Sequence, residues 1–236
     1  MTEEAKRLVK EKYGFQDLVD IMALLRSENG CPWDRAQTHE SIRKNFIEET
    51  YEACEAIDNH DTANLREELG DVLLQVLFHA QMEREAGRFD INDVITEVCE
   101  KLVVRHPHIF GDVSADTPEK VLENWEDIKI RTKGQTDGKK RLEDVPKSLP
   151  ALMRSYKVIK RAEKAGADLG APEDVADNTS ALLKDYLQAE QAEKEQIMGK
   201  MLINLVTLAK KFEIEPEEVL TKAVNWYIIS YKGNEE

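Results

Sequence analysis

Almost every segment of this chain repeats its apolar residues at the spacing of an α-helix, and no segment of any length alternates them as a β-strand would. Polar cap residues and prolines fall where such helices would begin, for example Thr38 and the pair Thr117–Pro118. Expected helices cover residues 15–28, 38–59, 65–85, 90–106 and 117–133, and three or four more follow residue 150. The sequence therefore predicts an all-α fold.

Composition narrows the class of protein. The chain has 236 residues, of which 41% are hydrophobic and 34% charged, as in a helix-rich globular protein. A net charge of −14 argues against a nucleic-acid partner, because phosphate contacts need a basic face. Cys31, Cys54 and Cys99 form no C-x-x-C pair, so a disulfide framework or a zinc site is not expected. With no apolar run near the roughly 18 residues that span a bilayer, and no signal-peptide core, we expect a cytoplasmic protein without a membrane partner.

The second half of the chain echoes the first. Residues 70–81 align with residues 199–210 without a gap, and residues 92–106 align with 217–231 once four residues are removed from the second copy. Two unrelated amphipathic helices can share apolar rows by chance, but the shared glycine before the long apolar run favours a duplication. We expect a repeat over 1–133, a polar, Gly- and Pro-containing linker over 134–150, and a degenerate repeat over 151–236.

The two copies differ in their polar residues. Ile197 and Lys200 stand where the first copy has Glu68 and Asp71, and Trp226 and Ser230 stand where it has Lys101 and Arg105. If the two halves arose by duplication, the second copy has lost its polar set and kept its packing.

Two pairs of acids in the first copy are candidates for a metal site. Glu49 and Glu52 share one helix face, as do Glu68 and Asp71, and two antiparallel helices would bring the pairs together. Four converging carboxylates raise one another's pKa unless a cation lies between them, and hard oxygen ligands favour Mg²⁺ or Mn²⁺. The alternative is a set of solvated or salt-bridged surface acids. A di-iron bundle needs Glu-x-x-His, which none of the five histidines provides.

A metal-bound triphosphate also needs cationic side chains. Lys101 and Arg105 lie at i and i+4 of one expected helix and suit phosphate oxygens, although ion pairing with nearby acids is the better explanation if these two residues are taken alone. Trp125 and Trp33 either stack on a base or belong to the core. The chain has no G-x-x-x-x-G-K-[ST] loop, so P-loop chemistry is excluded.

Taken together, these motifs resemble the MazG family, within the all-α NTP pyrophosphatase group. The family signature E-E-x-x-E followed by E-x-x-D is matched by Glu48, Glu49 and Glu52, then fifteen residues, then Glu68 and Asp71. The flanking stretches "NGCPWDRAQTH", "RHPHIFGD" and "SLPALMRSYKVIKRAEKAG" are also similar, so the resemblance covers about residues 15–166.

The resemblance implies a helical bundle, usually a homodimer, that converts a nucleoside triphosphate to the monophosphate and pyrophosphate with Mg²⁺. Carried over to this chain, it implies that the metal ligands are Glu49, Glu52, Glu68 and Asp71, with Glu48 behind them or orienting the attacking water. Lys101 and Arg105 would bind phosphates, and Trp125 with Lys129 would line the nucleotide pocket.

The second half departs from the family pattern because it lacks the signature. We therefore expect the activity in the N-terminal repeat, and packing or dimerisation by the C-terminal one. The alternative is a weak enzyme, or a nucleotide-binding regulatory or scaffolding protein, on the same fold.

Overall fold

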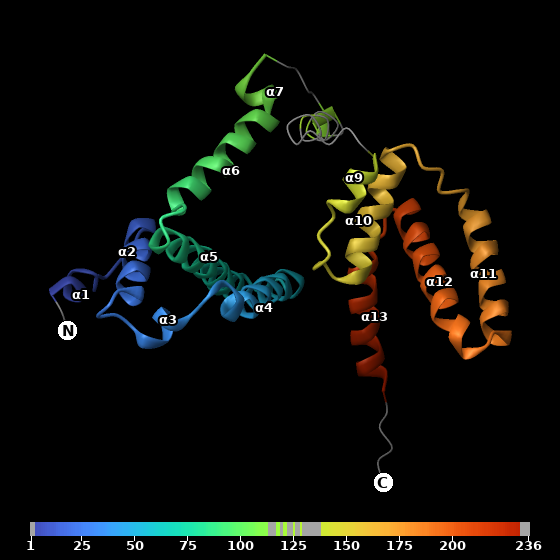
Figure 1. The fold of residues 1–236 in the computed structure, drawn as a ribbon, viewed down its shortest axis with the longest axis horizontal. Helices are drawn as coiled ribbons and strands as arrows, with labels where there is room; N and C mark the ends of the chain where they lie inside the picture. Colours follow the sequence, from blue (N-terminus) through green and yellow to red (C-terminus); the bar gives the residue numbers. More distant parts are fainter. Residues whose placement is uncertain are drawn as a thin grey trace, which may run out of the picture. The chain divides into compact units, whose positions relative to one another are not determined.

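The computed structural model of the chain describes residues 3–112, 117–118, 120–121, 125, 128 and 138–231. Within these ranges all regular structure is helical and there is no strand (Figure 1). The chain divides into two compact units, residues 1–121 and 122–236. The prediction of an all-α fold is therefore confirmed.

The first unit is built from helices whose ends are set by local capping. Thr38 caps α4 by accepting a hydrogen bond from the Ser41 amide, and Asp61 caps α5 by accepting from two amides of its first turn. The Asp61 cap starts α5 at Thr62, three residues before the predicted start at Leu65. The helices are α1 Glu3–Arg7, α2 Phe15–Arg26, α3 Pro32–Ala36, α4 His39–Asp58, α5 Thr62–Glu85, α6 Ile91–Arg105 and α7 Pro107–Phe110.

The centre of this unit is the antiparallel hairpin of α4 and α5, which lie side by side (Figure 1). Its apolar contacts gather at the end away from the turn, where α2 and the first turn of α6 pack against α5. One cluster contains Met22, Ile42, Phe78 and Met82, and the other contains Val19, Leu77, Ala80 and Ile91. Full burial of each large side chain contributes about 2 kcal/mol, so these clusters anchor the hairpin at one end.

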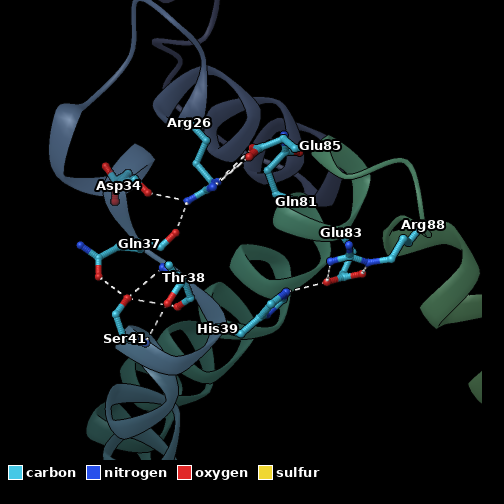
Figure 2. A network of polar contacts seen from close by, with 10 residues as sticks. All are labelled: Arg26, Asp34, Gln37, Thr38, His39, Ser41, Gln81, Glu83, Glu85 and Arg88. Atoms are coloured by element: carbon cyan, nitrogen blue, oxygen red, sulfur yellow. Dashed lines mark hydrogen bonds and ion pairs between the residues drawn. The ribbon is translucent and has the colours of Figure 1, made fainter.

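A buried arginine fastens the segment between α2 and α4 to the same end (Figure 2). Arg26 has a side chain only 6% exposed, and it donates hydrogen bonds to both oxygens of the Glu85 carboxylate, the shortest at 2.9 Å to Oε1 and 2.8 Å to Oε2. Its remaining nitrogen donates to the carbonyl oxygens of Asp34 and Gln37. Because a buried charge without a partner is costly, the pairing with Glu85 keeps Arg26 in position to hold α3 and the start of α4 in place.

A second polar network ties α4 to α5 on the neighbouring face (Figure 2). His39 contacts Glu83 through Nε2 at 2.5 Å and stacks on His79, with the two Nδ1 atoms 2.7 Å apart. Arg88 donates two further hydrogen bonds to Glu83. These hydrogen bonds from Arg88 are the chief cause that lowers the pKa of Glu83 to about 2, so the carboxylate is ionised and His39 must donate to it.

The second unit has the same order of parts, a helix, a two-helix hairpin and a further helix. The α11–α12 hairpin is packed against α10, which also contacts α13. Its buried residues include Ile159, Val175, Met201 and Val206. The helices are α9 Gly138–Glu143, α10 Ala151–Lys164, α11 Pro172–Gln188, α12 Gln191–Lys211 and α13 Pro216–Ser230.

The predicted linker and the helix before it fall only partly within the described structure. Of residues 134–150, the first four lie outside it, and α9 forms within the remainder. The helix predicted over 117–133 also lies mostly outside the described residues.

The Glu83 network predicts a pH-dependent stability. Because the folded-state pKa of Glu83 lies below its ordinary value of 4.5, the ionised carboxylate stabilises the fold above pH 4.5, and this contribution is lost as the pH falls toward 2. We expect Glu83→Gln to lower the urea midpoint at pH 7, and its difference from the parent to shrink between pH 4.5 and pH 3. Glu55→Gln, an exposed acid on α4, serves as the control. A difference that is the same at pH 6 and pH 3 would contradict this account.

Candidate metal centre

Carboxylates from both helices of the α4–α5 hairpin meet near its turn. One carboxylate oxygen each from Glu49, Glu68 and Asp71 lies within 4.8 Å of the other two, and all three side chains are half-buried. The fourth predicted acid, Glu52, lies one turn after Glu49 and is exposed. The structure therefore brings three of the four acids into one cluster and places the fourth at its rim.

The register of the hairpin explains why these acids meet. Ile42 of α4 and Phe78 of α5 share one apolar cluster, which fixes how the two helices face each other. We call the line along which α4 and α5 face each other the seam. Seven residues closer to the turn in each helix, this seam brings Glu49 opposite Asp71. The seam therefore changes from apolar to acidic over about two helical turns.

Two of the acids, Glu49 and Glu68, have a raised pKa. Burial raises the pKa of Glu49, and the charges of Asp71 and Glu52 raise it further. Burial also raises the pKa of Glu68, as do the charges of Glu52 and Asp71. The exposed Glu52 acts on both residues, so all four carboxylates belong to one electrostatic unit that favours a proton or a cation.

The chemistry of this donor set fits a hard divalent cation. All its side-chain donors are carboxylate oxygens, which suit Mg²⁺ or Mn²⁺ and not a soft metal. The half-exposed position leaves room for the waters that Mg²⁺ retains and for phosphate oxygens. The residues present therefore fit the metal that the signature implies.

Glu48 lies outside the cluster. It is the residue before Glu49, so its side chain leaves the helix about 100° away. Lys44, one turn earlier, forms a 3.0 Å ion pair with it on the outer surface of α4.

The predicted phosphate-binding residues lie away from the cluster in this chain. Only the first turn of α6 packs against α5, through Ile91 and Val94, and α6 then leaves the hairpin (Figure 1). Its later apolar residues Ile95, Val98, Leu102, Val103 and Val104 are all exposed. Lys101 follows in this diverging part and pairs with Glu97 at 3.2 Å, and Arg105 ends the helix.

Trp33, one of the predicted base-binding residues, is separate from the acids. Trp33 is 60% exposed on α3, which precedes α4, and Glu49 lies ten residues into α4, about 15 Å along its axis. Trp125 is half-buried, and Lys129 lies outside the described residues.

One buried polar residue beside the cluster was not among the predicted site residues. Gln75 follows Asp71 by one turn of α5 and is only 7% exposed. The sequence offered a signal for Gln75, which lies within an apolar run. A polar residue four positions after a predicted metal ligand faces the same side of the helix as that ligand.

Comparison with known proteins identifies relatives over most of the chain. A family model described as the MazG nucleotide pyrophosphohydrolase domain matches residues 37–110, which include all of α4, α5 and α6. The chain is 42% identical over 223 residues to the nucleoside triphosphate pyrophosphohydrolase/pyrophosphatase MazG of Thermotoga maritima, covering 94% of this chain and 86% of that protein. It is 44% identical over 213 residues to the nucleoside triphosphate pyrophosphohydrolase of Escherichia coli K12, covering 87% and 81%.

A third relative is longer. The uncharacterized protein YabN of Bacillus subtilis is 44% identical over 231 residues, which cover 93% of this chain and 45% of YabN. None of the helices in the described part of this chain is long and apolar enough to cross a membrane.

The acidic cluster predicts opposite effects of one substitution with and without metal. The pKa of Glu68 is raised in the folded state, so the free energy of unfolding falls as the pH rises through that pKa. Ionised Glu68 therefore opposes folding at pH 7 when no cation is bound. We expect Glu68→Gln to raise the melting temperature in EDTA by roughly 1–3 °C. The same variant should lose the rise that Mg²⁺ produces in the parent, which corresponds to about 2.7 kcal/mol at a hundredfold excess over Kd.

Glu195→Gln on α12 is the matched control and should change neither value. A lower melting temperature of Glu68→Gln in EDTA would show that mutual repulsion does not govern this cluster.

Proposed function

The chain belongs to the MazG family of nucleotide pyrophosphohydrolases, and we propose that it hydrolyses a nucleoside triphosphate to the monophosphate and pyrophosphate. The convergence of Glu49, Glu68 and Asp71 within 4.8 Å is the observation that carries this proposal. The family names of the relatives supply the substrate class, and the carboxylates supply the means to hold a metal–phosphate complex.

In this proposal Glu49, Glu52, Glu68 and Asp71 hold Mg²⁺, which Mn²⁺ can replace. When bound, the cation neutralises phosphate charge and lowers the pKa of a coordinated water. A water oxygen forms a bond to the α-phosphorus, the bond from that phosphorus to the bridging oxygen breaks, and pyrophosphate leaves. Glu48 lies outside the cluster and pairs with Lys44 at 3.0 Å, so it would act behind the metal ligands or orient the attacking water.

Lys101 and Arg105 are assigned to the phosphates, and this assignment requires a second copy of the chain. Within one chain α6 diverges from the hairpin and presents the exposed apolar stripe Ile95, Val98 and Leu102. An unpartnered stripe of this kind is typical of an interface. We propose a homodimer in which this stripe packs on the partner and delivers Lys101 and Arg105 to the partner's acidic cluster, whose charge is opposite.

The second unit is assigned to assembly. The acids Glu68 and Asp71 have the counterparts Ile197 and Lys200, which offer no carboxylate. Helix α13 has an exposed apolar stripe of its own, formed by Leu220, Val224 and Tyr227. The order of its helices supports an origin by duplication, with packing and dimerisation as its remaining role.

Three further assignments complete the proposal. Trp125 and Lys129 would line the nucleotide pocket. Trp33 lies near the start of α4, so it would contact a base only at that end of the helix or in the partner's site. Nucleic acid is not expected as a partner because the net charge is −14. A cytoplasmic location remains the prediction from the sequence.

The activity is tested by incubating the protein with Mg²⁺ and a panel of ribonucleoside and deoxyribonucleoside triphosphates, then separating products by ion exchange. We expect monophosphate and pyrophosphate, and a loss of at least about 100-fold in Asp71→Asn, because even outer-shell partners of a metal contribute 10–100-fold. Asp185→Asn, on the hairpin of the second unit, is the control. Diphosphate and phosphate as products would refute attack at the α-phosphorus.

The dimeric site is tested by mixing two inactive variants, Asp71→Asn and Lys101→Ala, after reversible unfolding. If Lys101 acts on the partner's cluster, each mixed dimer contains one site with both residues intact. Random mixing should then restore about one quarter of the parent activity. No restoration, in a mixture shown by mass spectrometry to contain mixed dimers, would place Lys101 and Asp71 of the same chain in one site.

A further inference from the structure

A buried oxygen beside the acidic cluster has no hydrogen-bond partner. The Oε1 atom of Gln75 is fully buried, and nothing in the described structure donates to it. Leaving a buried acceptor without a donor costs roughly 1–3 kcal/mol, so buried side-chain oxygens almost always have a partner. The Gln75 amide is therefore either an unrelieved defect or an acceptor for something that binds.

The position of Gln75 directs this oxygen toward the metal ligands. Glu68, Asp71 and Gln75 are spaced i, i+3 and i+7 and share one face of α5. Helical side chains lean toward the helix N-terminus, so the Gln75 side chain leans toward the turn that carries Asp71.

Across the seam, Asn45 of α4 is the residue that faces Gln75. It lies one turn before Glu49, as Gln75 lies one turn after Asp71, and α4 and α5 run in opposite directions. Along the hairpin, Asn45 and Gln75 thus lie between the apolar cluster that contains Ile42 and Phe78 and the acidic cluster that contains Glu49 and Asp71. Because Gln75 Oε1 has no donor, the Asn45 amide does not close on it.

The second hairpin shows what the same level becomes without the acids. In the ungapped alignment Asn204 of α12 stands at the position of Gln75. Its Nδ2 donates a 2.8 Å hydrogen bond to Oδ1 of Asn178 on α11. In the hairpin without carboxylate ligands, the amide therefore forms a hydrogen bond across the seam. In the hairpin with them, the amide oxygen has no hydrogen-bond partner.

We propose that Gln75 is a positioning residue whose side-chain oxygen accepts a hydrogen bond from a water molecule bound to the divalent cation, an inference that rests on the metal-dependent function proposed above. An amide oxygen only accepts, and a coordinated water is a strong donor. Phosphate oxygens also only accept and so cannot be the partner. Mg²⁺ and Mn²⁺ retain several waters in sites of this kind, and hydrogen bonds to the surrounding shell tune their affinity.

The test measures metal binding without any nucleotide. Gln75→Met keeps the length of the side chain and removes the acceptor oxygen. Mn²⁺ titrations followed by electron paramagnetic resonance should show about tenfold weaker binding than in the parent, and relaxation of water protons should report a changed set of bound waters. In EDTA the melting temperature of Gln75→Met should equal or exceed that of the parent, because a buried orphan acceptor has been removed.

Two further variants separate this role from packing. Gln75→Glu keeps an acceptor oxygen and adds a charge, so it should bind Mn²⁺ at least as tightly as the parent and melt at a lower temperature in EDTA. Asn204→Leu removes an exposed hydrogen bond to Asn178 in the second unit, which water can replace, so it should change the melting temperature little and leave the Mn²⁺ affinity unchanged.

The outcomes distinguish the failure of each idea. A parent protein that binds no Mn²⁺, or binds it equally after Glu68→Ala, refutes the metal site itself. A parent that binds Mn²⁺ with the same affinity and water relaxation as Gln75→Met refutes only the role of Gln75. Loss of affinity in Gln75→Met only when nucleotide is present would assign the oxygen to a sugar hydroxyl and overturn the inference. If Gln75→Met does not fold, tenfold weaker binding by Gln75→Glu overturns it.

Discussion

The antiparallel register of α4 and α5 is the constraint on which the first unit depends. One alignment of the two helices buries Ile42 against Phe78 and, two turns away, brings Glu49 to Asp71. Rotation of either helix by one residue would turn the seam about 100° away and break both contacts together. The apolar contacts therefore supply the geometry that the carboxylates need, and the carboxylates contribute repulsion in return.

The two ends of the hairpin have opposite energetic roles. At the end away from the turn, apolar clusters are joined by the bidentate Arg26–Glu85 pair and by the Glu83 network (Figure 2). Near the turn, burial and like charges raise the pKa of Glu49 and Glu68. A site that repels itself has to be placed on a scaffold stabilised elsewhere, as is usual for functional sites.

Much of this could be predicted from the sequence because the signals are local. Helical periodicity and the Thr38 cap place α4, and the i, i+3 spacing of acids places the cluster on a helix face. The start of α5 was predicted three residues late because the Asp61 cap was not recognised. Arg26 in a buried position and the direction of α6 depend on tertiary contacts, which periodicity does not contain. Gln75 was missed because its environment is defined by the opposite helix and by the absence of a donor.

Selection for stability alone acts in one direction on a hairpin of this kind. Each carboxylate replaced in the seam removes repulsion, and an amide pair such as Asn178–Asn204 then satisfies the remaining polar atoms. Both steps raise the stability of the hairpin when no cation is bound. A hairpin that no longer binds metal can therefore become more rigid and inactive by single substitutions. The return path passes through less stable sequences at every step. In a chain with two such hairpins, selection on turnover is needed to keep the acidic hairpin reactive, whereas the hairpin without the acids stays firm with no such selection.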